Sequence, residues 1–168
     1  DVLSFWHWSA SDLISNALRG RVAEYLVAQA LGVGTEIRAE WDAYDLSTQT
    51  GTTIEVKSAA YLQTWAQAEH SKISFSIAPT RRWDPNTNRF DDNSKRQAKL
   101  YVFALLAHRD KDTLDPLDVA QWSFFVLPTQ VLNTKLTLQK RISYQTLTRL
   151  HPTTCTFDQL GDTIRNAE

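Results

Sequence analysis

A strand that carries two opposite charges on one face is the feature that most constrains this chain. Residues 52–58 read Thr-Thr-Ile-Glu-Val-Lys-Ser, are rich in β-branched side chains and follow a polar run that is typical of a turn. Because side chains alternate along a strand, Glu55 and Lys57 share one face, about 6.5 Å apart along the chain. Ile54 and Val56 share the other face. The sequence therefore predicts a hairpin with an acid and an amine side by side.

The hairpin can bring a second carboxylate to the same face. Asp45 lies before the turn, and pairing of the two strands returns it toward Glu55. Two carboxylates are stable together only beside a compensating cation, and magnesium binds through one or two carboxylates while it keeps positions for water and phosphate. Lys57 can then orient the attacking water or stabilise charge on the phosphorane. This set predicts phosphodiester hydrolysis with Mg²⁺ or Mn²⁺.

Asp45 together with Glu55-Val56-Lys57 resembles the core motif of the PD-(D/E)xK superfamily, the restriction-endonuclease-like nucleases. The resemblance covers residues 11–67 in detail and implies a metal-dependent nuclease that acts on DNA. Tyr44 stands where the motif often has proline, and Asp42 is the alternative first acid. When the motif is taken alone, the same charges fit a solvated surface hairpin equally well.

A helix that precedes the hairpin adds a third acid. Apolar spacing predicts a helix over residues 11–31, started by a capping-box-like pair at Ser9 and Asp12 and stopped by Gly32. Glu24 lies within the apolar face of this helix, and a buried acid needs a cation or a metal. A structural alternative is an ion pair with the neighbouring arginine at position 21, or a division of the helix at the glycine at position 20.

The segment from Gly20 to Ala28 resembles the Gly-x-x-(Ala/Gly)-Glu helix of Holliday-junction-resolvase-like members of the same superfamily. In those relatives the helix glutamate is an additional ligand of the metal or of its water, and this role transfers to Glu24. The resemblance therefore implies four catalytic residues, which are Glu24, Asp45, Glu55 and Lys57. The three acids among them would hold the metal.

The remaining signals complete an α/β fold. Strands are expected at 34–38, 41–46, 52–58, 71–78, 99–106 and 121–128, and further helices at 129–132, 144–150 and 156–164. With the helix at 11–31 this order matches the opening of a restriction-endonuclease-like fold. We expect a single domain over residues 1–168, with an αβββαβ core and a mixed central sheet of about five strands flanked by helices.

Several residues are candidates for contact with nucleic acid. The polar segment 80–99 contains six cations and is the best candidate for a phosphate-contacting loop, with Arg81, Arg82 and Arg96 as its contacts. Three aspartates dilute its charge, so a solvated loop is the alternative. Gln63 and Ser58 are further, weaker candidates, because in several nuclease families a polar residue shortly after the lysine assists the site. The favoured alternative is that both are ordinary polar groups of a loop or a helix cap.

Composition limits the classes of function. The net charge of −1 argues against a protein that coats nucleic acid through a strongly positive surface. No apolar run approaches the roughly 20 residues of a membrane span, and the lone Cys155 fits a reducing, cytoplasmic setting. The superfamily resemblance also admits a homodimer, because two strands need cutting.

An aromatic cluster at Phe5 to Trp8 precedes the first predicted helix. Packing against the body of the protein is its expected role, and stacking on bases is the minority alternative. The rival to the nuclease hypothesis is a module that keeps the fold without cleaving, either to bind nucleic acid or to dock a partner within a larger complex through this cluster.

Overall fold

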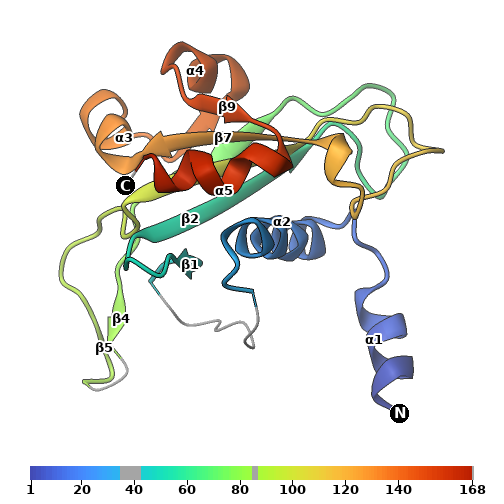
Figure 1. Cartoon of the computed structure of the whole chain (residues 1–168), viewed down its shortest axis with the longest axis horizontal. Coiled ribbons are helices and arrows are strands. Elements are labelled where there is room, and N and C mark those ends of the chain that lie inside the picture. The colour runs from blue at the N-terminus through green and yellow to red at the C-terminus, as the bar shows by residue number, and fades with distance from the viewer. Residues whose placement is uncertain (35–42, 85–86, 168) are drawn as a thin grey trace.

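A mixed sheet forms the centre of the computed structural model, which describes residues 1–34, 43–84 and 87–167. Its five strands lie in the order β1-β2-β6-β7-β9. β2 and β6 run parallel, and the other neighbouring strands run antiparallel. The strands are β1 (Leu46–Ser47), β2 (Thr53–Ala60), β6 (Leu100–Leu106), β7 (Trp122–Pro128) and β9 (Thr153–Cys155). The expected α/β class and mixed sheet are therefore confirmed (Figure 1).

Helices cover both faces of this sheet. The described helices are α1 (Val2–Ala10), α2 (Asn16–Leu31), α3 (Thr129–Lys135), α4 (Tyr144–Arg149) and α5 (Phe157–Arg165), with a 3-10 turn η1 (Val119–Gln121). Residues of α2 and α5 pack in one core against alternate side chains of the strands. Residues of α3 and α4 pack in a second core on the other face, so α2 lies below the strands and α4 above them in Figure 1.

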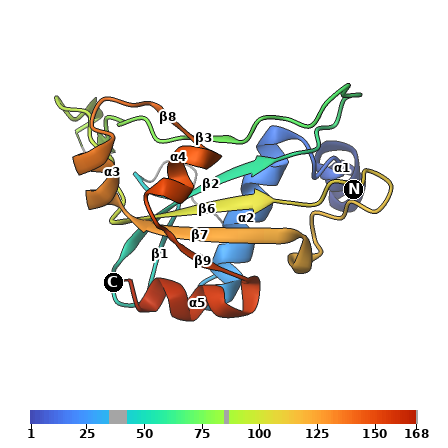
Figure 2. The ribbon, with the colours of Figure 1, turned by 90° about the horizontal axis from the view of Figure 1, so that it is seen from above.

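Two short ribbons accompany the main sheet. β3 (Ser74–Ser76) pairs antiparallel with β8 (Arg141–Ser143), and this ribbon crosses the second core (Figure 2). β4 (Trp83–Asp84) pairs with β5 (Arg89–Phe90) in a hairpin that projects from the body. The strand predicted at 71–78 is thus shorter and belongs to the β3-β8 ribbon. The segment predicted as a polar loop at 80–99 contains the β4-β5 hairpin.

The first long helix starts later than predicted. α2 begins at Asn16 because the side chain of Ser15 caps it, accepting from the backbone N–H of Leu18. The predicted cap pair at Ser9 and Asp12 is therefore wrong. The predicted stop is confirmed, since Gly32 takes the left-handed conformation with φ 72° and its N–H bonds two carbonyls of the last turn.

The predicted packing of the aromatic cluster is also wrong. Phe5 to Trp8 lie inside α1, none of whose described side chains is buried, and Trp8 is 84% exposed. Figure 1 shows α1 standing apart from the sheet. The sequence pattern did not distinguish this exposed aromatic helix from a core segment because both are rich in large apolar side chains.

The strand predictions differ in outcome. β2, β6 and β7 confirm the predicted strands, and α3, α4 and α5 confirm the later helices within a few residues. The strand predicted at 34–38 lies outside the described residues apart from residue 34. Of the strand predicted at 41–46, residues 41 and 42 also lie outside them, and residues 43–45 form bends, so β1 is shorter than predicted.

Candidate active site

Asp45 lies where the pairing between β1 and β2 ends. The antiparallel register pairs Leu46 with Ile54, and Asp45 lies just beyond the end of β1, close to Glu55 and Val56. The backbone N–H of Asp45 donates to the carbonyl of Ile54 at 3.0 Å. Its carboxylate oxygen Oδ2 accepts from the backbone N–H of Val56 at 2.7 Å. The side chain of Asp45 therefore occupies the acceptor position that a longer β1 would give to a backbone carbonyl.

Glu55 and Lys57 lie on one face of β2, as the alternation of side chains along a strand predicted, and Asp45 lies close to them. Ile54 and Val56 are buried against the other face, in the core that includes α2. The ammonium of Lys57 and the carboxylate of Glu55 form an ion pair with an Nζ to Oε1 distance of 2.5 Å, and both side chains are partly exposed. The acid and the amine therefore contact each other and remain open to solvent.

Burial and nearby negative charge raise the pKa of the Asp45 carboxyl group to about 6. Burial is the largest cause, and the negative charge of Glu55 is the second. The hydrogen bond from Val56 and the positive charge of Lys57 act in the opposite direction, but they are too weak to cancel burial and repulsion. A carboxylate held in this way gains stability from a nearby cation.

Glu24 belongs to the same electrostatic cluster. It lies half-buried on α2, and its negative charge is a further cause of the raised pKa of Asp45. The structure thus brings Asp45, Glu55 and Lys57 together from the approach to β1 and from β2, and Glu24 of α2 is near enough for its charge to act on Asp45. Asp42, the alternative first acid, lies outside the described residues.

The donor set at this cluster fits a hard divalent ion. Among residues 1–34, 43–84 and 87–167, no group of three or more His, Cys, Asp or Glu side chains is arranged closely enough to hold a metal. Magnesium requires only one or two carboxylates, with water in the remaining positions. Asp45, just before β1, and Glu55 on β2 can supply two such oxygen ligands, and their mutual repulsion favours a cation between them.

Tyr101 is a neighbour of this cluster that the sequence did not single out. It pairs with Glu55 across β2 and β6 and is 3% exposed. Burial raises the pKa of its phenol, and the charges of Glu55 and Asp45 raise it further. The sequence did not indicate that Tyr101 lies beside Glu55. Tyr101 falls within a continuous apolar run, and the pairing of β2 with β6 becomes known only with the structure.

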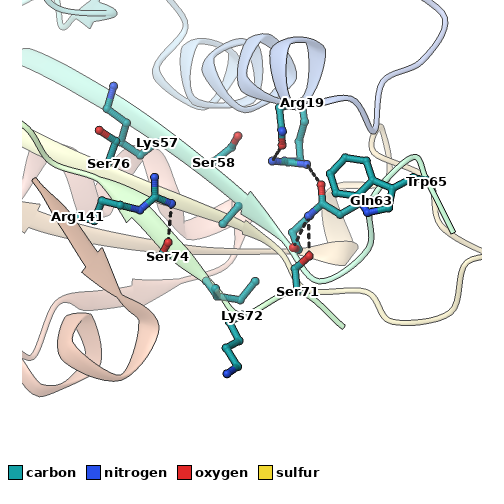
Figure 3. A pocket seen from close by; sticks show the side chains of 14 residues that line it. Arg19, Lys57, Ser58, Gln63, Trp65, Ser71, Lys72, Ser74, Ser76 and Arg141 are labelled. Carbon is teal, nitrogen blue, oxygen red and sulfur yellow. Dashed lines mark hydrogen bonds between the residues drawn. The ribbon is translucent and has the colours of Figure 1, made fainter. Parts of the chain in front are cut away.

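A cleft with a volume of about 440 Å³ opens beside Lys57 (Figure 3). Its walls come from the start of α2, the second half of β2, and the β3-β8 ribbon. Within the described lining there are four cations, no aspartate and no glutamate; the cations are Arg19, Lys57, Lys72 and Arg141. The positive charge of the cleft contrasts with the net charge of −1 of the whole chain.

Gln63 lines this cleft and is 7% exposed. Its amide nitrogen Nε2 donates to the carbonyl of Ala60 and to the hydroxyl of Ser71, both at 3.1 Å. Its carbonyl oxygen Oε1 accepts from Arg19 at 3.4 Å. Gln63 is therefore placed beside the site, where it fixes an arginine.

The three arginines predicted to bind nucleic acid lie outside the lining of the cleft. Arg96 is 7% exposed, and its guanidinium donates to three backbone carbonyls and to Asn133, so it stabilises the fold around α3. Arg81 and Arg82 are exposed beside the β4-β5 hairpin, and Arg81 lies over the ring of Phe90 at 5.7 Å. The guanidinium of Arg96 is thus occupied by acceptors within the fold.

A comparison with models of protein families assigns the chain to a family. The sequence model described as bacteriophage T4 endonuclease IV matches residues 2–158. The chain belongs to the bacteriophage T4 endonuclease IV family. Membership supports a nuclease, and a nuclease acts on nucleic acid; the PD-(D/E)xK assignment stays a prediction. A search of curated proteins gives no match. Over the described residues, no helix has the length and apolarity to cross a membrane.

Proposed function

We propose that this chain is a metal-dependent endonuclease that hydrolyses phosphodiester bonds in DNA, with a site of the restriction-endonuclease type. The observation that carries the proposal is the placement of Asp45 close to Glu55, where it bonds the backbone of Val56, next to the ion pair of Glu55 with Lys57. Membership in an endonuclease family supports the same reaction from independent information.

Each residue of the cluster has a role in this proposal. Asp45 and Glu55 would hold Mg²⁺ or Mn²⁺, and Glu24 would assist directly or through a water. When bound, the ion supplies positive charge for the phosphoryl oxygens and lowers the pKa of a water ligand. From the same strand face, Lys57 would orient the attacking water and stabilise charge on the phosphorane. Water would add to phosphorus and release a proton to the solvent, the bond between phosphorus and the leaving sugar oxygen would break, and that oxygen would take up a proton from the solvent.

A cleavage assay tests the proposal. The substrates are supercoiled plasmid, linear duplex, single-stranded and branched DNA, with RNA for comparison, each with Mg²⁺, with Mn²⁺ and with chelator. Lys57→Ala should lower the cleavage rate by about 10²- to 10³-fold, the usual effect of removing one group that stabilises the transition state. Lys135→Ala is the matched control, because Lys135 is an exposed lysine in the last turn of α3.

Metal titrations complete the test. Asp45→Ala, Glu55→Ala and Glu24→Ala should each weaken binding of Mg²⁺, measured by calorimetry. Unchanged affinity in all three variants would overturn the assignment of the ligands. A wild-type protein that neither binds Mg²⁺ nor cuts any of these substrates would favour a non-catalytic module with the same fold.

A further inference from the structure

A buried arginine, for which the described residues provide no anionic partner, lies in the wall of the cleft. Arg19 is 5% exposed. Its Nη1 donates to the carbonyl of Ile14 at 3.0 Å and to Gln63 at 3.4 Å, and its Nη2 donates to Asn16 at 2.7 Å. All three acceptors are neutral, and Nε has no hydrogen-bond partner among the described atoms. A guanidinium has five N–H donors, so these bonds leave two of them unused.

This placement is costly for the fold. Burial lowers the pKa of Arg19, and no described acid offsets that effect. Arg19 also lies in the first turn of α2, where the helix dipole is positive and where the helix has no acidic residue. A buried cation at the positive end of a helix is stable only with strong compensation. An anion that enters the cleft would supply it.

The opposite wall of the cleft presents a second arginine. Arg141 on β8 is exposed, and its Nη2 donates to the hydroxyl of Ser74 at 2.6 Å. In Figure 3, Arg19 and Arg141 stand on opposite sides of Ser58, and Lys57 lies on the same strand as Ser58. The side chain of Lys72 points away from Arg19 in this view. Two guanidiniums therefore flank a space that adjoins the Lys57 end of the candidate active site.

We propose that this cleft binds a backbone phosphate of the nucleic acid next to the scissile phosphate, with Arg19 as its buried anchor and Arg141 on the opposite wall. The inference rests on the proposed function, because the shared residue Lys57 joins the cleft to the hydrolytic site. Guanidinium groups suit this role, since their planar donors match two phosphate oxygens at once. The nucleic-acid strand would run alongside β2 from Glu55 toward Ala60, because the Ala60 end of β2 forms part of the cleft.

The salt dependence of binding tests the cleft without requiring cleavage. Fluorescence anisotropy would measure the affinity of short single-stranded and duplex oligodeoxynucleotides in chelator over a range of salt concentrations. The logarithm of the affinity falls as the logarithm of the salt concentration rises. Each phosphate contact that is lost makes this slope less steep by about 0.7 for single strands to 0.9 for duplex. Arg19→Gln and Arg141→Gln should each show this decrease and weaker binding. Arg165→Gln is the control, an exposed arginine on α5 outside the cleft.

Arg141→Gln keeps the test informative if Arg19→Gln fails to fold, because Arg141 is exposed. Arg19→Lys should retain the slope but bind more weakly than wild type, since lysine keeps the charge and loses the fork. Circular dichroism would establish that each variant is folded.

The outcomes separate this inference from the proposed function. Unchanged slopes in folded Arg19→Gln and Arg141→Gln, with metal-dependent cleavage that Lys57→Ala abolishes, would overturn the phosphate site and leave the nuclease proposal standing. Decreased slopes without cleavage under any metal would support the phosphate site and overturn the hydrolytic role. A wild-type protein that binds none of the oligonucleotides would overturn both.

Discussion

The carboxylate of Asp45 accepts a 2.7 Å hydrogen bond from the backbone N–H of Val56. Val56 is the middle residue of the Glu55-Val56-Lys57 element, so the backbone of the motif itself holds the first acid close to the second. The short β1 makes this contact available, because a longer strand would place a backbone carbonyl there. The arrangement concentrates negative charge, and its consequences can be measured in the metal-free protein.

Asp45→Asn should stabilise the metal-free protein above pH 6. The folded-state pKa of Asp45 is raised from 3.8 to about 6, so the folded protein retains a proton that the unfolded chain loses as the pH rises through this interval. The carboxylate therefore destabilises the fold above pH 6 by about 2 to 3 kcal/mol, and has no such effect below pH 3.8. Asparagine keeps an acceptor for Val56 and removes the charge. Urea unfolding of wild type and Asp45→Asn in chelator, below pH 3.8 and above pH 6, measures the difference in their free energies of unfolding.

The control for this experiment is Asp158→Asn. Asp158 is an exposed acid in the first turn of α5, so its charge stabilises the helix there and its removal should not increase stability. An equal free energy of unfolding for wild type and Asp45→Asn above pH 6 would contradict the raised pKa.

Glu55→Gln should lower the pKa of Asp45 toward its ordinary value. The negative charge of Glu55 is the second largest cause of the raised pKa, after burial, and glutamine removes the charge with little change in shape. Titration of the Asp45 carboxyl group by NMR in chelator measures the shift. Glu69→Gln should leave that pKa unchanged, because Glu69 is exposed and is not among the charges that act on Asp45. A pKa that stays near 6 in Glu55→Gln would show that burial acts alone.

Magnesium should stabilise the protein more at pH 8 than at pH 5. A proton on Asp45 competes with the ion below a pKa of about 6, so binding requires deprotonation. A ligand present at 100 times its dissociation constant stabilises the folded state by about 2.7 kcal/mol. Thermal unfolding with Mg²⁺ and with chelator at the two pH values measures the gain. Asp45→Asn should lose most of the gain at pH 8, and an equal gain in this variant would remove Asp45 from the ligands.

Local pattern was sufficient to predict the central strands and the acid-lysine pair. The alternation in β2 placed Glu55 and Lys57 together, and the apolar runs marked β6 and β7. The helices predicted at 144–150 and 156–164 match α4 and α5, for which Ser143 and Thr156 are the N-caps. The start of α2 was wrong because Ser9, Asp12 and Ser15 are all acceptable caps, and tertiary contacts decide among them.

The cleft required the tertiary structure. Arg19 falls in a helix, Gln63 in a loop and Arg141 in a short strand, and their sequence separation hides their convergence. The charge pattern instead favoured residues 80–99, where cations are dense in sequence. Arg96 in that segment serves the fold, because four neutral acceptors from distant segments occupy its guanidinium.

Gly161→Ala should destabilise the protein by about 1 to 3 kcal/mol, the usual cost of overpacking a core. A Cβ at Gly161 on α5 would clash with the backbone carbonyl oxygen of Ala30 on α2, so the two helices would have to separate. Gly20→Ala is the matched control, because the nearest atom to its Cβ is the hydroxyl of Ser58 at 4.0 Å. Alanine favours the helix interior over glycine, so this control should gain about 0.5 to 1 kcal/mol. Chemical denaturation measures both, and comparable stability of the two variants would contradict the close crossing of α2 and α5 that holds the Glu24 helix against the sheet.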